Sequence, residues 1–245
     1  MLQRTVRGSD LIALSLSVLL APAVATGEIQ SFSGPLAGTV IAGEEPGGGM
    51  ASGTEFSDMI LDVLNQGGGP SSLIVFDSSA PTGGDYDLGT PNEDFGGPGI
   101  GSGGRAGQPG ENGTAQGNLL IIAEEIHDGD GDGLVDDPDD EGGGGQIRFA
   151  FYEPVELHAL GLVDIDDRSS AMVELYLDDQ LLAAIPASSL GNNSYETLDL
   201  TGHGAADLLV LTLQGSGGVA FIDYVPPTTP TRGGSWGAIK HEFLR

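Results

Sequence analysis

The sequence contains no cysteine and only eight lysine and arginine residues among its 245 residues. Without cysteine the chain can form no disulfide, no thiolate zinc site and no cysteine nucleophile. The 36 aspartate and glutamate residues outnumber the basic ones and give a formal net charge of -28. Such a charge repels the phosphate backbone of nucleic acids and the anionic surface of membranes. We therefore expect no nucleic-acid partner and no adsorption to an anionic membrane.

Glycine is abundant instead, with 42 residues, but it follows no Gly-X-Y period, which excludes collagen. Hydrophobic residues make up 39% of the chain and are concentrated in short β-rich runs, which a disordered acidic protein would lack. The length suits one domain of average to large size. The charge must then lie in loops, where carboxylates either repel one another or share cations.

The first 25 residues have the pattern of a secretory signal peptide. Arg4 and Arg7 form a basic start, an apolar run follows from Leu11 to Leu20, and Ala23 and Ala25 make a small-x-small cleavage site. About ten apolar residues are too few to span a bilayer, which needs about 20. We expect export to the cell surface or beyond, with no stable membrane span after cleavage. Extracellular calcium is millimolar there, so even weak oxygen sites fill.

Residues 26–225 carry strand signals separated by turn residues, without a helical period. We expect strands at 72–76, 118–123, 146–152, 155–164, 171–177, 181–185, 196–200, 208–213 and 219–224. Many short strands at such spacing are typical of an antiparallel sandwich or barrel. The prediction is an all-β fold, an antiparallel two-sheet β-sandwich of jelly-roll or galactose-binding-like form.

Two segments stand apart from the strands. Residues 95–117 contain ten glycines, which are costly to order, so a flexible surface loop is favoured over a phosphate cradle. Residues 226–245 are expected to be a linker and a short C-terminal segment. In that segment Trp236, Ile239 and Phe243 have the spacing of one helical face, too short to be stable alone, so it docks on the domain or on another protein.

The most acidic stretch, residues 124–141, contains ten acids and a calcium-loop pattern. Residues 128–139 read DGDGDGLVDDPD, close to the pattern D-x-D-x-D-G-x-x-D. Alternate spacing directs three carboxylates at one point, and hard cations accept such oxygens at about 2.3–2.6 Å. The predicted ligands, at positions 1, 3, 5, 7, 9 and 12 of the loop, are Asp128, Asp130, Asp132, the Leu134 carbonyl, Asp136 and Asp139.

This loop differs from a true EF-hand in two ways. Position 12 is Asp139 rather than glutamate, with Asp140 or Glu141 able to compensate, and no helix pattern flanks the loop. The loop resembles the DxDxDG calcium loops of dockerin and thrombospondin type 3 repeats. The alternative interpretation is a solvated acidic loop. Calcium is favoured because unpaired carboxylates at this density repel one another.

A second group of acids lies near the ends of the expected strands. Loops at one end of a sandwich converge, so these acids are candidates for a second metal site, although aspartate is also common in turns. The candidates are Asp77, Asp85, Asp87, Asp164, Asp166 and Asp223.

The stretch from Leu73 to Tyr224 resembles a group of secreted bacterial β-sandwich surface proteins of the PEP-CTERM-associated type. The resemblance rests on Phe76-Asp77, on PTGGDYDLGTPN at 81–92, on the acidic loop and on Asp164–Asp166. It implies a bacterial extracellular or periplasmic location and a role in surface or matrix binding. An apolar sorting tail of that type does not follow Pro227, so release or another route of attachment is expected.

We expect a non-catalytic protein. None of the four histidines lies in a catalytic spacing, and the sequence has no G-x-S-x-G elbow. The predicted function is a secreted calcium-binding β-sandwich that interacts at a surface or with extracellular matrix. Its expected partners are calcium and a glycan or another extracellular protein. The alternatives are a carbohydrate-binding module, with tyrosines or Trp236 as stacking platforms, and a secreted hydrolase.

Overall fold

The computed structural model describes residues 27–166 and 170–226 of the chain. The predicted signal peptide and the C-terminal segment therefore lie outside the described residues. The described part contains twelve strands and two short 3-10 helices. They are β1 (Glu28–Ser31), β2 (Val40–Glu44), β3 (Met50–Ser52), β4 (Met59–Asn65), β5 (Ser72–Asp77), η1 (Tyr86–Leu88), η2 (Glu93–Phe95), β6 (Asn118–Ile122), β7 (Gly145–Val163), β8 (Ala171–Leu177), β9 (Gln180–Pro186), β10 (Tyr195–Asp199), β11 (Ala205–Leu213) and β12 (Gly218–Val225).

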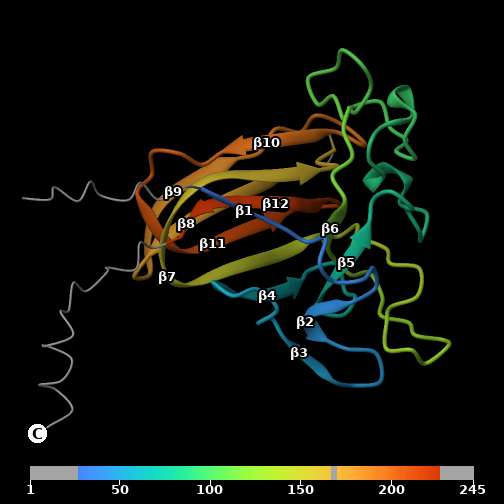
Figure 1. Ribbon diagram of the computed structural model, residues 1–245, viewed down its shortest axis with the longest axis horizontal. Helices are drawn as coiled ribbons and strands as arrows, with labels where there is room; N and C mark the ends of the chain where they lie inside the picture. The colour runs from blue at the N-terminus through green and yellow to red at the C-terminus, as the bar shows by residue number, and fades with distance from the viewer. Residues whose placement is uncertain (1–26, 167–169, 227–245) are drawn as a thin grey trace, which may run out of the picture.

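Strand β7 is shared by two layers. Its first half pairs with β4 and β11, and its second half pairs with β10 and β12. Between the halves the strand curves over, as Figure 1 shows. Pro154 lies in this bend, between Phe151, which pairs with Met59, and Glu156, which pairs with Val225. Because proline has no N–H to give to a ladder, the bend is a place where it costs little.

The two layers follow from this bend. The first layer contains β4, the first half of β7, β11, β8 and β9. The second layer contains β10, the second half of β7, β12, β6, β5, β2 and β3, with β1 alongside β12. Every named strand pair is antiparallel. The all-β antiparallel sandwich expected from the sequence is confirmed. In the described ranges no helix is long and apolar enough to cross a membrane.

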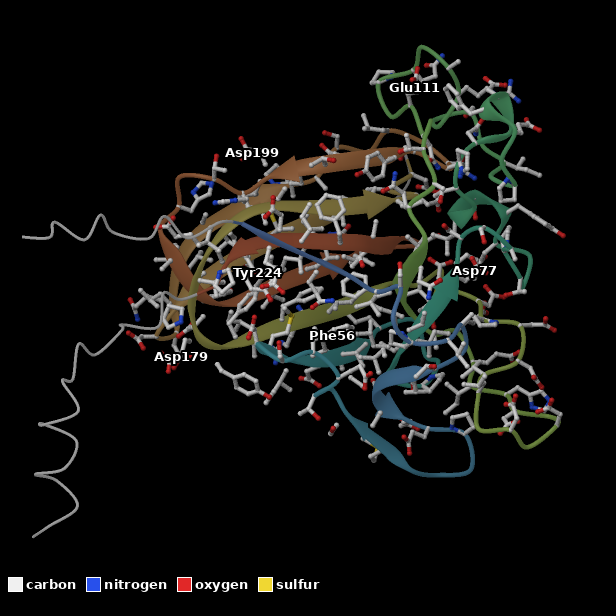
Figure 2. All side chains as sticks on the ribbon, in the orientation of Figure 1. Phe56, Asp77, Glu111, Asp179, Asp199 and Tyr224 are labelled. Atoms are coloured by element: carbon white, nitrogen blue, oxygen red, sulfur yellow. The ribbon has the colours of Figure 1, made fainter. Side chains whose placement is uncertain are left out.

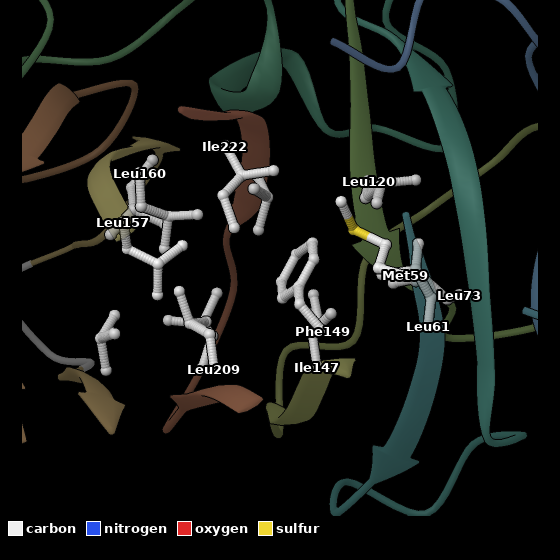
Figure 3. Close-up of a cluster of buried hydrophobic side chains, with 14 of the residues drawn as sticks. Met59, Leu61, Leu73, Leu120, Ile147, Phe149, Leu157, Leu160, Leu209 and Ile222 are labelled. Carbon is white, nitrogen blue, oxygen red and sulfur yellow. The ribbon is translucent and has the colours of Figure 1, made fainter. Parts of the chain in front are cut away.

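The core lies between the layers and is built by alternation. Residues at every second position of β4, Met59, Leu61 and Val63, are buried, while those between them are exposed. Phe149 of β7 is fully buried in the same cluster. Figure 3 shows these side chains meeting Leu120 and Ile222, which come from the second layer.

A second cluster covers the outer face of the second layer. There Ile74, Phe76, Leu119 and Ile121 are fully buried, although their strands have core on the other side. Leu88 and Val135 cover them from the loops at 78–117 and 124–144. These loops gather at one end of the sandwich, on the right of Figure 1, which we call the loop end. Burial on both faces explains why β5 and β6 have continuous apolar runs rather than alternation.

Two expectations need correction. The strands expected at 146–152 and 155–164 are one strand, β7, because Pro154 bends the chain without ending the ladder. The glycine-rich segment 95–117 is packed rather than loose at several of its glycines. A Cβ added to Gly101 or Gly103 would come within 2.4 Å of a carbonyl oxygen of Asn192 or Leu190. Glycine is needed there for close backbone approach, not for freedom of movement.

Replacing Phe149 by alanine tests the role of the core between the layers. The ring is fully buried, so Phe149→Ala should lower the free energy of unfolding by about 3–5 kcal/mol. Leu36→Ala, at a side chain that is 70% exposed, should change it by less than about 0.5 kcal/mol. Urea denaturation in saturating calcium measures both, and equal effects would contradict this assignment of the core.

Candidate metal centre

The acidic loop folds into a cradle of carboxylates held by its own backbone. One carboxylate oxygen each of Asp128, Asp130 and Asp132 lies within 4.8 Å of the other two. Oxygens that bind one calcium ion at 2.3–2.6 Å are at most about 5 Å apart, so the three side chains have the spacing of a ligand set. Asp128 is half-buried, and the other two are exposed.

Backbone N–H groups fix these carboxylates in place. Asp128 accepts from Gly131 N at 2.7 Å through one oxygen and from Gly133 N at 3.0 Å through the other. Desolvation would raise the pKa of Asp128, but these N–H donors, with that of Asp132, bring it below its ordinary value. Asp132 accepts from Leu134 N at 2.8 Å. The loop backbone therefore holds these carboxylates in a defined geometry and favours the ionised form of Asp128.

The loop is anchored at its far side by Val135, which is buried in the second hydrophobic cluster. Val135 N donates to Gly38 O at 2.9 Å, and Asp136 N donates to His127 O at 2.7 Å, which closes the loop. The Asp136 carboxylate accepts from Gly129 N at 2.7 Å. Gly133 has a φ of 87°, a left-handed conformation that suits the sharp bend at position 6.

A second acid group lies deeper at the loop end. Oxygens of Asp85, Asp139 and Asp140 lie within 4.8 Å of one another. Asp140 N donates to Asp85 Oδ2 at 2.7 Å, and Thr82 Oγ1 donates to Pro138 O at 3.0 Å. These bonds join the loop after β5 to the end of the acidic loop. Figure 2 labels Asp77, the last residue of β5, at this end of the sandwich.

Burial raises the pKa values of Asp85 and Asp140 in this group. Asp140 is only 6% exposed, and burial raises the pKa of its carboxyl to about 6 although Gly217 N and Ser216 donate to it. For Asp85, burial and then the charge of Asp140 raise the pKa to about 9. Protons hold these groups together in the metal-free protein, since carboxylates this close cannot all be ionised.

Further acids lie near the end of β7, which is beside the start of β12. Asp164 is 1% exposed; it accepts from Asn193 N at 2.6 Å and from Ser216 Oγ at 2.9 Å. Burial and then the charge of Asp87 raise the pKa of Asp164 to about 8. Burial also raises the pKa of Asp87, with further contributions from the charges of Asp166 and Asp139.

Among the described residues, no ion pair neutralises Asp85, Asp139, Asp140 or Asp164. The ion pairs found there are Arg105–Glu93 at 3.2 Å and His158–Asp223 at 3.6 Å. Neither involves Asp85, Asp139, Asp140 or Asp164. A cluster of buried carboxylates without a counter-ion favours either bound protons or a bound cation.

The predicted ligands are divided between the two groups. Asp128, Asp130 and Asp132 lie together as expected, and Asp136 closes their loop. At position 7, the Leu134 N–H donates a hydrogen bond to the Asp132 carboxylate. Asp139 was expected at position 12 of the loop, but the structure places it with Asp85 and Asp140. The chain turns at Pro138 toward Thr82, which carries Asp139 away from the loop.

The candidates for the second site are also divided. Asp85 lies in the second group itself. The charge of Asp87 acts on Asp140 and on Asp164, and the charge of Asp166 acts on Asp87. Asp77 instead caps its own turn, accepting from Ser79 N at 2.9 Å. Asp223 lies in β12 opposite Ala159 and beside His158, five residues from the loop end of that strand. Neither belongs to either group of three.

Sequence reasoning missed the central place of Asp140 and of three asparagines. Asn92, Asn112 and Asn193 are fully buried, and Asn193 Nδ2 donates to Gly89 O at 2.6 Å while Asn92 Nδ2 donates to Asn193 Oδ1. They tie the glycine-rich segment to the turn before β10 and thereby fix the backbone around Asp164. No sequence signal marks them, since buried and exposed asparagines look the same in a polar segment.

The pH dependence of stability tests the raised pKa values. In a chelator, stability should fall as pH rises from about 5 to about 9. The reason is that Asp140, Asp164 and Asp85 have folded-state pKa values of about 6, 8 and 9, above the unfolded value near 3.8, so the folded state binds more protons in this window. Thermal midpoints in EDTA across the window measure the fall.

Asp85→Asn is the matched variant for this measurement, because its amide oxygen still accepts from Asp140 N while one titrating group is removed. The fall in midpoint should be shallower in this variant. Asp179→Asn, in an exposed turn at the opposite end of the sandwich, should leave the slope unchanged. A midpoint that rises with pH in EDTA would show that these carboxyls are not protonated in the folded protein.

Comparison with known proteins assigns no function to these acid groups. No family model matches the chain, and no curated protein matches it. The functional conclusion therefore depends on the two acid groups, on their hydrogen bonds and on the sequence patterns that predict one of them.

Proposed function

We propose that the protein is a secreted, non-catalytic β-sandwich that binds calcium at its loop end and interacts at a surface or with extracellular matrix. The observation that carries the proposal is the set of Asp128, Asp130 and Asp132, whose oxygens converge within 4.8 Å on a loop shaped by its own N–H groups. The signal-peptide pattern at 1–25 and the resemblance to secreted surface proteins support the location.

The donor chemistry favours calcium over other metals. Both groups offer carboxylate oxygens alone, with no histidine in either group and no cysteine in the chain. Oxygen donors suit calcium, magnesium and manganese, whereas zinc and copper prefer nitrogen and sulfur. Calcium also accepts irregular coordination with six to eight oxygens, which fits a loop without the bidentate glutamate of an EF-hand. We expect a dissociation constant of about 10⁻⁴ to 10⁻³ M for the exposed loop.

Two cations would act on different parts of the loop end. An ion at Asp128, Asp130 and Asp132 would hold the acidic loop closed over Val135 and the second hydrophobic cluster. An ion at Asp85, Asp139 and Asp140 would join the loop after β5 to the acidic loop, in place of the protons that hold these acids together. Calcium then takes a structural role like that of a disulfide in other exported domains.

The alternatives have less support. Hollows of about 250, 430 and 310 Å³ lie among the described residues, and none of the three is lined by a tryptophan, tyrosine or phenylalanine on which a sugar could stack. The largest is lined by glycines, Ser102, Gln108 and Arg105, whose guanidinium already pairs with Glu93. No specific observation therefore favours a carbohydrate-binding module or a hydrolase.

Calcium titration tests the proposal directly. Isothermal titration calorimetry on the chain from residue 26 should show two sites, and Asp130→Asn should weaken only the loop site. Asp85→Asn should weaken only the deeper site. Each occupied site should stabilise the fold by about 2.7 kcal/mol at a hundredfold excess of calcium over its dissociation constant. The thermal midpoint should rise accordingly on adding calcium and fall back on adding EGTA.

The control is Asp179→Asn, which makes the same change of charge in a left-handed turn remote from both groups. It should leave both affinities and the calcium-dependent rise in midpoint unchanged. The decisive concentration of calcium is about 10 mM, roughly ten times the weakest expected dissociation constant. If the wild-type protein gives no heat of binding and no shift in thermal midpoint at that concentration, calcium binding is refuted.

A further inference from the structure

The first layer has an apolar outer face. Alternate residues of a strand point to opposite faces of its sheet, so the residues between the core positions point outward. Five large apolar side chains on this outer face are 37 to 55% exposed: Ile60, Leu64, Tyr152, Met172 and Leu181, which pairs with Tyr176. The solvent face of an antiparallel sheet is normally polar, and a contiguous apolar face is typical of an interaction site.

The apolar residues form rows across the strands. Ile60 of β4 pairs with Ala150 of β7, which pairs with Leu208 of β11, which pairs with Tyr176 of β8. The next row contains the charges of the face, with Asp62 opposite Arg148 on one side and Glu174 opposite Val210 on the other. The surface is thus a continuous sheet face with two carboxylates and one guanidinium.

The two layers differ in how their outer faces are covered. Loops cover the outer face of the second layer, where Phe76 and Ile121 are fully buried. Within the part of the chain that the structure describes, the corresponding face of the first layer stays exposed. A segment beyond the described residues, or another molecule, is needed to cover it.

Charge favours one occupant over the others. Residues 26–225 contain 34 acidic residues and three arginines, whereas residues 226–245 contain three basic residues, Arg232, Lys240 and Arg245, and one acid, Glu242. A second copy of the domain would bring two strongly negative bodies together, which is unfavourable. The C-terminal segment has the opposite sign, and its apolar residues Trp236, Ile239 and Phe243 have the spacing of one helical face.

The chain leaves the sandwich beside this face. Tyr224, the penultimate residue of β12, donates through its hydroxyl to Asp58 at 3.0 Å, and its ring lies 5.3 Å from that of Phe151. Asp58 O in turn accepts from Tyr152 N at 3.0 Å. Because Phe151 and Tyr224 belong to the core cluster, β12 ends on the core side of the first layer, level with Ile60 and Tyr152. A chain that leaves there reaches the outer face by passing around this end of the layer.

The linker is long enough to reach every row. Ten residues, 226–235, span at most about 33–36 Å when extended. The five strands of the first layer, at spacings of about 4.8 Å, extend about 19 Å from β4 to β9. Linking also raises the effective concentration of the segment near the face, so weak contacts suffice.

We propose that residues 236–245 dock on the outer face of the first layer of the same chain. Trp236, Ile239 and Phe243 cover the rows that begin at Ile60, and the basic residues Lys240 and Arg245 lie toward the carboxylates Asp62 and Glu174. This inference does not depend on calcium binding, because the face lies on β4, β7, β11, β8 and β9 and contains no residue of either acid group.

Trp236 is the only tryptophan, so its fluorescence reports on docking alone. In the folded chain from residue 26 we expect emission at shorter wavelength than that of N-acetyltryptophanamide and reduced quenching by acrylamide, a neutral probe that the acidic protein does not repel. Both signs of protection should persist on dilution, because the docking is intramolecular. Emission and quenching equal to those of the free amide would overturn the proposal.

Substitutions on the face locate the docking surface. The double variant Ile60→Thr and Met172→Thr should shift the Trp236 emission to longer wavelength and increase its quenching, since threonine keeps the strand but removes apolar area. The control Leu36→Thr and Ile100→Thr changes two apolar residues that are 70% and 50% exposed outside the face, and it should leave both readings unchanged. Far-UV circular dichroism verifies that each variant is folded.

A charge variant gives a second reading if the apolar variant does not fold. Asp62→Asn with Glu174→Gln should increase quenching of Trp236, while Asp179→Asn with Glu111→Gln, at other surface sites, should not. Protection that survives both face variants would show that the segment docks elsewhere. Protection that disappears on dilution would show that a second copy binds it. Either outcome would overturn the proposal.

Discussion

The mutual repulsion of buried carboxylates at the loop end is the constraint on which the loops depend. Asp140 and Asp164 are almost fully buried, and Asp85 and Asp139 lie beside them without a protein cation in the described ranges. Burial of such charges is unfavourable unless protons or cations bind. The N–H groups of Gly217 and Asn193 donate hydrogen bonds to these carboxylates, and buried asparagines fix the surrounding backbone. If calcium binds as proposed, protons and calcium compete for the same oxygens, so pH and calcium act on one equilibrium.

The sandwich makes this repulsion tolerable by fixing the positions of the acids. β7 and β12 end side by side, and their neighbouring loops carry Asp164 and Gly217 to one place. The acidic loop and the loop after β5 are attached to the same scaffold through Val135 and Leu88, in the second hydrophobic cluster. Because apolar burial holds the loops independently of any ion, we expect the metal-free protein to remain folded with a less ordered loop end.

Much of the fold was predictable from the sequence, because its signals are local. Alternation in Val173, Leu175 and Leu177 and turn residues at regular spacing marked most strands correctly. The convergence of the three loop aspartates was predictable for the same reason, since they lie two residues apart in the sequence. Asp139 was placed wrongly in the loop because its position depends on a distant contact, the bond from Thr82 to Pro138. Asp223 could not be excluded either, because only the register of β12 shows which end of the strand faces the loops.

The acid groups and the apolar outer face are separate in space, and this separation has an energetic consequence. β12 runs from the loop end, where Gly218 pairs with Ile121, to the chain exit at Val225, a length of about 23 Å for the seven steps between its eight residues. The Debye length at physiological ionic strength is about 8 Å, so charge changes at the loop end are largely screened at the exit. Binding of two calcium ions would neutralise four negative charges at the loop end, and the attraction between the basic segment and the outer face would stay unchanged. Sites this far apart with no shared side chains contribute nearly additively to stability. On these two proposals the negative charge of the chain has two local roles: repulsion among buried carboxylates, which favours bound protons or cations at one end, and attraction of a basic segment by the carboxylates of the outer face at the other.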